Sequence, residues 1–266
     1  MAKQELVLSK RELVKRVIVT PDKHFPLADD PAISVLCKAI HKVKPHAYID
    51  LGDVGEWSSV SAWKYKRKIA PPVEFILEEL KQDIKDVNDG MDVIDAALDA
   101  AGCKERHFIE GNHDDWVNRF VEKYPYLSQY ALSKAIKLDK RGYTYHPFGK
   151  HLKMGKLYFY HGHQYGGQYH SANHLRKLGC NIMYGHWHDL QHMTVTHMDG
   201  PKAAWSIGCL KDMKAEANAW LDNRKINWAH AFAIVDFYGK GEFTVDVVQI
   251  VYGRCSIWGE LLDGNK

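Results

Sequence analysis

Two histidines separated by one residue are the part of this sequence that most directly suggests chemistry. His186 and His188 directly follow the apolar run 182–184. In extended backbone, residues i and i+2 point to the same side, so both imidazoles are expected to face one point. Imidazole is a ligand for Zn, Fe, Mn and Ni. One such pair is weak evidence, because neighbouring histidines are more often surface or core residues.

Four stretches upstream strengthen this interpretation, because each places polar residues in a turn after a predicted strand. They contribute Asp22 and His24, Asp53, Asn112 and His113, and His161. Any one of these residues could cap a helix or fill a turn, but five such turns at five strand ends are hard to obtain by chance. The sequence therefore predicts a metal site assembled from strand ends.

The elements that must position these residues alternate between strand and helix. Residues 16–20 and 47–51 are expected as strands, joined by a helix that Asp30 caps, with Pro31 at its first position, and that runs through Val43. This order indicates a parallel β-α-β unit, which binds ligands at the carboxyl ends of its strands. Further strands are expected at 107–109 and 157–160, a helical region at 116–137 and a short helix at 171–178. Antiparallel strands are expected at 194–198, 203–207, 232–237 and 243–252.

Residues 57–102 differ in character and are expected to form a helical insertion within a single domain of residues 1–266. A helical pattern runs from Pro72 to Ala101, and Gly90 is expected to divide it into two helices. The insertion also carries a basic cluster, which is either a solvated face or a contact for phosphate or nucleic acid. Its members are Lys64, Lys66, Arg67 and Lys68.

The composition is that of an ordinary globular protein and excludes several classes. The 266 residues are 45% hydrophobic and 26% charged, and the net charge of +3 is too small to imply nucleic-acid binding by itself. Five scattered cysteines without a CxxC pair favour a reduced, cytoplasmic location. Residues 1–16 do not read as a signal peptide, and no apolar run approaches the ~20 residues of a membrane span, so no membrane partner is expected.

Taken together, the ordered blocks resemble the calcineurin-like metallophosphoesterases. The blocks are Asp22-Lys23-His24, Gly52-Asp53, Gly111-Asn112-His113-Asp114, His161 and Gly185-His186-Trp187-His188. The longer contexts 111–119 and 227–232 look most like phage and prophage members of that family. The resemblance implies an α/β fold, a four-layer α/β/β/α sandwich with two metal ions between its sheets.

The resemblance also implies a role for each site residue. It assigns Asp22, His24 and His188 to the first ion, gives Asn112, His161 and His186 to the second, and makes Asp53 the bridge. Two divalent ions ~3.5–4 Å apart would stabilise the attacking and leaving oxygens of an in-line displacement. The mixed donor set suits Mn²⁺, expected first, or Fe, Zn or Ni, and is too rich in nitrogen for Ca²⁺.

Several neighbouring residues have two readings. By the same resemblance His113 would protonate the leaving alkoxide as general acid. Asp114 would orient the other ring nitrogen of His113 or cap the following helix. Glu56 is read as a partner of a ligand, and His163 as a partner of a ligand or a structural residue. Trp187 could narrow the pocket or stack against its occupant. Histidines without a motif are expected as surface or core residues, namely His170, His174, His192 and His197.

Three functions compete. The first is a phosphodiesterase that uses a metal-bound hydroxide on nucleic-acid or nucleotide-type diesters, including cyclic nucleotides. The second is a phosphomonoesterase, including a protein phosphatase, although an arginine-bearing signature beside Gly52-Asp53 is missing. The third is a non-catalytic metal-binding scaffold, which intact ligands and His113 disfavour. A diester is preferred because aromatic and basic residues that could wall the site occur in the insertion and in the loop 210–229. In the insertion they are Trp57, Trp63, Lys64, Tyr65, Lys66 and Arg67. In the loop they are Lys211, Lys214, Trp220, Arg224 and Trp228.

Overall fold

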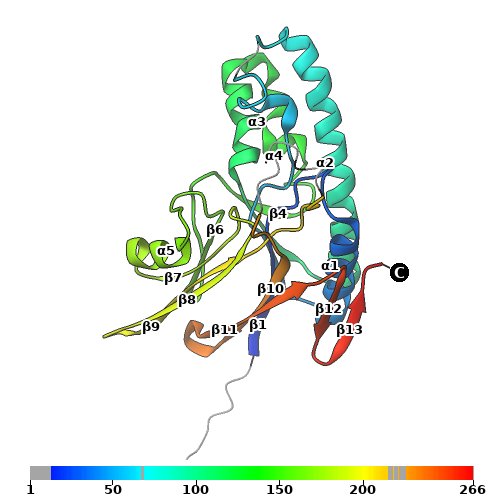
Figure 1. Ribbon diagram of the computed structural model, residues 1–266. Coiled ribbons are helices and arrows are strands. Elements are labelled where there is room, and N and C mark those ends of the chain that lie inside the picture. The colour runs from blue at the N-terminus through cyan, green and yellow to red at the C-terminus, as the bar shows by residue number, and fades with distance from the viewer. Residues whose placement is uncertain (1–12, 67–68, 215–217, 219–220, 222–225, 266) are drawn as a thin grey trace, which may run out of the picture.

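A computed structural model describes residues 13–66, 69–214, 218, 221 and 226–265 (Figure 1). Its larger sheet carries one half of the predicted site. Within those ranges this sheet has six strands in the order β11-β10-β1-β2-β3-β4. Strands β1 to β4 are parallel, and β10 and β11 are antiparallel. The strands are β1 (Leu13–Thr20), β2 (Ala47–Asp50), β3 (Glu105–Ile109), β4 (Tyr143–His146), β10 (His230–Tyr238) and β11 (Phe243–Ile250).

The second sheet carries the other half of the site. In the same described ranges it has the order β5-β6-β7-β9-β8, with β6, β7 and β9 parallel and β5 and β8 antiparallel at its edges. Its strands are β5 (Leu152–Met154), β6 (Leu157–Tyr160), β7 (Asn181–Tyr184), β8 (Leu190–His197) and β9 (Gly200–Ile207). A separate hairpin is formed by β12 (Arg254–Ile257) and β13 (Glu260–Asp263).

Helices cover the outer face of each sheet (Figure 1). The α-helices are α1 (Asp30–Val43), α2 (Val73–Ala101), α3 (Asn112–Lys123), α4 (Leu132–Ala135) and α5 (His170–Leu178). Short 3₁₀ helices are η1 (Ser58–Val60), η2 (Pro125–Tyr130) and η4 (Gly239–Gly241). Helices α1 and α2 pack against each other beside the larger sheet, and α5 lies beside β7, β8 and β9.

Three apolar cores show the layering. The inner core joins the two sheets through residues such as Val19 of β1 and Phe159 of β6. A second core joins the opposite face of the larger sheet, through Ile18, to α1 and α2. A third joins the smaller sheet to Leu175 of α5. Because apolar side chains alternate across each strand, both sheets are buried on two sides, and the predicted four-layer α/β/β/α sandwich is confirmed.

The structure corrects two details of the helices. Gly90 does not divide the insertion, because α2 runs unbroken through 29 residues from Val73 to Ala101. A Cβ at Gly90 would lie 2.4 Å from the ring of Phe25, so close packing explains this glycine. Helix α1 is capped by Asp29 rather than Asp30, since the Asp29 side chain accepts a hydrogen bond from the Ala32 N–H at 2.9 Å.

The helical insertion and the single-domain organisation remain predictions. Helix α2 buries Leu80, Val87 and Leu98 in the outer core and projects past the sheets together with α3 (Figure 1). Of the basic cluster, Arg67 and Lys68 lie outside the described residues, as do Trp220 and Arg224 of the loop 210–229. Among the helices that the structure describes, none combines the length and the apolar character needed to cross a membrane.

Candidate metal centre

The predicted ligands lie directly after β1, β2, β3, β6 and β7, where the carboxyl ends of parallel strands in the two sheets meet. Asn112 is the first residue of α3, and the others lie in loops. Four of these residues have a left-handed backbone, with φ of 55° at His24, 47° at Asp53, 66° at His186 and 61° at His188. Non-glycine residues rarely adopt this conformation, and such strain concentrates at functional sites. The loops therefore hold these side chains in directions that ordinary strand geometry does not give.

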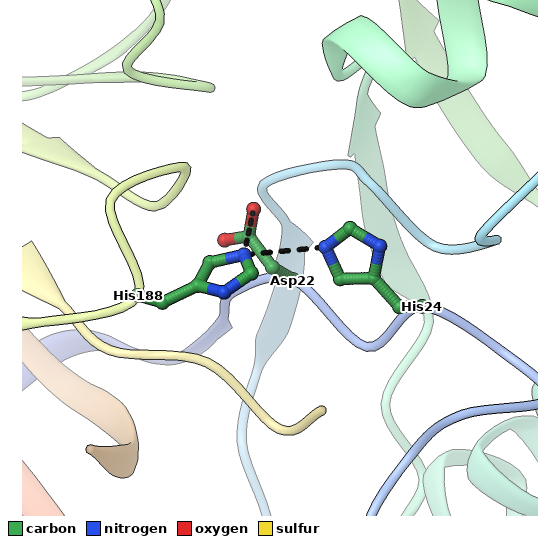
Figure 2. Close-up of side chains that lie close together, drawn as sticks. All are labelled: Asp22, His24 and His188. Atoms are coloured by element: carbon green, nitrogen blue, oxygen red, sulfur yellow. Dashed lines mark hydrogen bonds and ion pairs between the residues drawn. The ribbon is translucent and has the colours of Figure 1, made fainter. Parts of the chain in front are cut away.

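Asp22, His24 and His188 form the first group of possible ligands (Figure 2). Nε2 of His188 lies 3.2 Å from Nε2 of His24 and 3.5 Å from Oδ1 of Asp22. The three side chains are buried, and the Trp228 ring packs edge-on against His188 with centroids 4.4 Å apart. Two loops from different sheets therefore converge on one point.

Asp53, His161 and His186 form the second group. Nε2 of His161 lies 3.3 Å from Oδ2 of Asp53 and 3.2 Å from Nδ1 of His186. Oδ1 of Asn112 lies 2.9 Å from the same His161 nitrogen. The four residues that the resemblance places around the second ion are thus together, at the ends of β2, β3, β6 and β7.

The extended-backbone argument predicted that His186 and His188 face one point, but in the structure they do not. Both residues have positive φ, so the backbone between them turns and sends their imidazoles to different groups. That argument was wrong, although the two histidines do both lie in possible metal groups. The division agrees with the one that the resemblance implies.

Asp53 lies between the two groups. Its Oδ2 is 3.3 Å from Nε2 of His161 and 3.9 Å from Nε2 of His24, so one oxygen faces both groups. Its Oδ1 accepts a hydrogen bond from the backbone N–H of His113 at 2.8 Å. Gly111 allows this approach, because a Cβ there would lie 2.2 Å from that oxygen. Asp53 therefore lies where one carboxylate could contact ions at both groups.

The electrostatics of these residues suit a cation. Burial favours the neutral form of Asp22, but the hydrogen bond to His188 and the charge of His161 outweigh burial and lower its pKa to about 2. Burial lowers the pKa of His24 to about 4 and that of His186 to about 3, so both imidazoles are neutral near pH 7, as ligands must be. Burial acts in the same direction on His161, but the Asp53 carboxylate outweighs it and raises the pKa to about 10. Positive charge is therefore stabilised between the two aspartates.

The donor set fits divalent metal ions. Within each group the candidate ligand atoms lie within 4.8 Å of one another, and the donors are carboxylate oxygen and imidazole nitrogen. The Nδ1–H of His161 donates to the Leu51 carbonyl at 2.9 Å, which turns Nε2 toward Asp53. Nδ1 of His24 lies 2.9 Å from Oε2 of Glu56, a close polar contact that does not have hydrogen-bond geometry. The reading of Glu56 as a partner of a ligand agrees with this contact.

His113 stands beside the two groups. Its Nδ1 lies 3.0 Å from the Glu56 carbonyl, and because a carbonyl only accepts, Nδ1 carries the hydrogen. Its ring packs on Trp116 at 3.9 Å and on the edge of His24 at 4.7 Å. Among the described residues, a further group of possible ligand atoms joins His113 to His24 and Asp53. His113 is therefore close enough to contact a molecule held at the groups.

Asp114 has partners other than His113. Its carboxylate accepts hydrogen bonds from the Trp57 indole N–H at 2.8 Å and the Gly111 N–H at 3.1 Å. Of its two readings, the structure shows the one that caps α3. The carbonyl of Glu56, not the carboxylate of Asp114, is the group that contacts the His113 ring.

The other histidines of interest pack in the interior. His163 stacks on Phe148 with centroids 4.2 Å apart and is in none of the metal groups found among the described residues. His170 lies between the Tyr184 hydroxyl, 2.8 Å from Nδ1, and the Asp189 carboxylate, 3.0 Å from Nε2. Trp187 stacks on His170 and donates from its indole N–H to the Gly162 carbonyl at 3.1 Å. The contacts of His170 and Trp187 therefore support the loop that carries His186 and His188.

Two buried lysines were not recognised from the sequence. Nζ of Lys23 lies 2.8 Å from Oδ1 of Asp50, and Nζ of Lys211 lies 2.8 Å from Oε2 of Glu56. Lys23 belongs to the first motif block, where sequence reasoning assigned it no role. Lys211 was read as one of several residues that could wall the site, whereas its side chain is buried and pairs with Glu56.

Comparison with known proteins gives structural similarity only. No protein-family model matches the chain, and no curated protein matches it in sequence. Solved structures that are similar include Vps29 from Cryptosporidium parvum, with 14% identity, 95% of this chain and 98% of that chain covered, and a TM-score of 0.49. A single mutant of Vps29 from Entamoeba histolytica has 16% identity, coverage of 93% and 98%, and a TM-score of 0.46. YfcE, a phosphoesterase from E. coli, has 12% identity, coverage of 87% and 98%, and a TM-score of 0.36. At these values none of them assigns an activity to this chain.

Proposed function

We propose that this protein is a binuclear metal-dependent phosphodiesterase of the calcineurin-like type that acts on nucleic-acid or nucleotide-type diesters. The position of Asp53 is the observation that supports this most strongly. One oxygen of Asp53 faces two buried groups of ligands, and the other is held by the backbone of His113. A carboxylate between two cation sites suits a two-metal centre that stabilises the attacking and leaving oxygens of phosphoryl transfer.

The residues of the site would have separate roles in binding metal ions and in donating a proton. Divalent ions held by the two groups would supply Lewis acidity toward the phosphate oxygens. Asp22, His24 and His188 would hold one ion, Asn112, His161 and His186 the other, and Asp53 would contact both. His113, fixed through Nδ1 by the Glu56 carbonyl, would present Nε2 to the leaving oxygen and donate a proton to it from the imidazolium form.

Aromatic residues beside the site favour a diester over a monoester. Trp228 packs on His188 and Trp116 packs on His113, so an indole borders the centre on each of two sides. Aromatic faces beside a phosphate site suit a substrate with a base or sugar on the phosphate, with stacking worth ~1–3 kcal/mol per base. In the insertion, Nζ of Lys66 lies 4.4 Å from the centre of the Trp63 ring and Lys64 pairs with Glu79.

A turnover panel tests this function. We expect hydrolysis of bis-nitrophenyl phosphate that chelation abolishes and Mn²⁺ restores, with slower turnover of nitrophenyl phosphate. The panel then ranks single-stranded DNA, duplex ends, RNA, and 2′,3′- and 3′,5′-cyclic nucleotides. Protein that carries two ions per chain and turns over none of these diesters would instead support the non-catalytic scaffold, and preference for the monoester would support the phosphomonoesterase.

The basic cluster provides a test of substrate size. Neutralising Lys64, Lys66, Arg67 and Lys68 together should weaken oligonucleotide binding and lower its salt slope by roughly one unit for each phosphate that the protein no longer neutralises. Cleavage of bis-nitrophenyl phosphate should stay the same. An unchanged salt slope would make the cluster a solvated face and favour a small cyclic or nucleotide-like diester.

Three finer parts of the proposal rest on the sequence. The likeness to phage and prophage members comes from the motif contexts around Asn112 and Trp228 alone. Mn²⁺ comes from the donor set, which Fe, Zn or Ni also suits. A cytoplasmic location comes from the scattered cysteines.

A further inference from the structure

A short segment after β9 is bound along the loop that carries the first ligands. The Leu210 N–H donates to the Asp22 carbonyl at 2.7 Å, and the Asp29 N–H donates to the Leu210 carbonyl at 2.8 Å. The Asp212 N–H donates to the Leu27 carbonyl at 2.7 Å. We call residues 209–212 the strap. Because its backbone bonds run from Asp22 to Asp29, the strap fixes the position from which the side chain of Lys211 enters the protein.

The side chain of Lys211 ends inside the site rather than in solvent. Only 1% of this residue is exposed, and its Nζ lies 2.8 Å from Oε2 of Glu56. The same oxygen lies 2.9 Å from Nδ1 of His24. A buried ammonium group is costly unless it is paired, and pairing here also places the Glu56 carboxylate against the imidazole.

Glu56 contacts the site through both its side chain and its backbone. Its carboxylate faces Nδ1 of His24, which leaves Nε2 of His24 directed at His188 and Asp53. Its backbone carbonyl accepts from Nδ1–H of His113. One residue therefore orients a candidate metal ligand and the candidate acid.

We propose that Lys211 is a positioning residue that holds Glu56 against His24 and so sets the metal affinity of the group Asp22, His24 and His188. The proposal rests on the metal centre of the proposed function. Without the ammonium group, the Glu56 carboxylate loses its charge partner and turns toward solvent, which leaves the His24 ring free to rotate. The group Asp53, His161 and His186 has its own support from Leu51 and is unaffected.

The test is a titration of the metal-free protein with Mn²⁺, without substrate, in a calorimeter and by metal content after dialysis. In Lys211→Met we expect one of two ions to bind ~10–100-fold more weakly, the range for loss of a partner that orients a ligand, and the other to bind as in wild type. Lys211→Arg should recover most of the affinity because it keeps the charge. Lys214→Met is the matched control two residues beyond the strap, because the Lys214 side chain is 75% exposed.

A second variant separates positioning from general loss of structure. Glu56→Gln removes the carboxylate charge and keeps the backbone carbonyl that contacts His113. It should weaken the same single ion, and its preference among leaving groups should remain that of wild type. If Lys211→Met does not fold, as judged by circular dichroism, Glu56→Gln decides alone.

Each outcome is distinguishable from failure of the proposed function. Two ions bound equally well in folded Lys211→Met, or in Glu56→Gln, would overturn the positioning role. Wild-type protein that binds no Mn²⁺ would overturn both the metal centre and this role. Wild-type protein that binds two ions but cleaves no diester would overturn the function only, and the metal titration would still decide the role of Lys211.

Discussion

The proposed role of His113 makes the sharpest prediction, because the structure separates its ring from its backbone. The backbone N–H of His113 holds Oδ1 of Asp53, and alanine keeps that N–H. What His113→Ala removes is the imidazole, with its contacts to the Glu56 carbonyl and the Trp116 ring. We therefore expect both metal groups to stay in place and both ions to bind.

The expected magnitude follows from the loss of a general acid. Proton donation to a leaving oxygen contributes ~10²–10⁴-fold, which is ~2.7–5.4 kcal/mol of barrier at ~1.36 kcal/mol per factor of ten. The defect should approach this range for an alkoxide leaving group, such as a ribose oxygen of a dinucleotide. It should shrink for nitrophenolate, which is stable without a proton.

The assay measures metal content beside turnover of a dinucleotide and of bis-nitrophenyl phosphate. His192→Ala is the control, since His192 stacks on Trp205 in the smaller sheet and is outside the metal groups found among the described residues. Loss of an ion in His113→Ala would show that His113 is a ligand, which its closeness to His24 and Asp53 allows. Equal slowing of both substrates with both ions bound would show that His113 does not protonate the leaving group.

Two other substitutions test the site and the fold. Asp53→Asn should abolish turnover almost wholly, because Asp53 faces both groups; near-normal turnover with two ions bound would disprove the bridge. Gly90→Ala should lower the free energy of unfolding by up to roughly 2 kcal/mol, because the cost of overpacking against Phe25 (~1–3 kcal/mol) outweighs the ~1 kcal/mol gain in helix propensity. Gly239→Ala is its control in denaturant titration, since a Cβ there meets nothing within 4 Å, and a Gly90→Ala protein at least as stable as wild type would contradict the packing account.

The positions of the site residues along the fold were predictable from local sequence. Each ligand follows a short apolar run, and in β1, β2 and β3 that run became a parallel strand of one sheet. The carboxyl ends of parallel strands share an edge, so residues after them must lie near one another. The closeness of these residues could therefore be predicted without any knowledge of the side-chain contacts.

Contacts between distant residues were not predictable in the same way. Lys211 and Glu56 are 155 residues apart, and only the completed sandwich brings the strap beside the loop after β2. Phe25 meets Gly90 across the outer layer, so a glycine that reads locally as a helix breaker is in fact a packing contact. The cap of α1 lies at Asp29 rather than Asp30, a difference of one residue, and both residues are good caps by type.

The loop after β7 shows why spacing alone gave the wrong geometry but the right residues. An i, i+2 pair shares a direction only in extended backbone, and φ values of 66° and 61° rotate His186 and His188 apart. The left-handed turn is held by Asp189, whose carboxylate accepts from the Ser206 hydroxyl at 3.0 Å and lies 3.0 Å from Nε2 of His170. Because the turn divides the pair, one loop supplies an imidazole to each metal group, while Asp53 joins the groups from the opposite sheet. The two candidate metal groups would therefore share two short loops, one from each sheet.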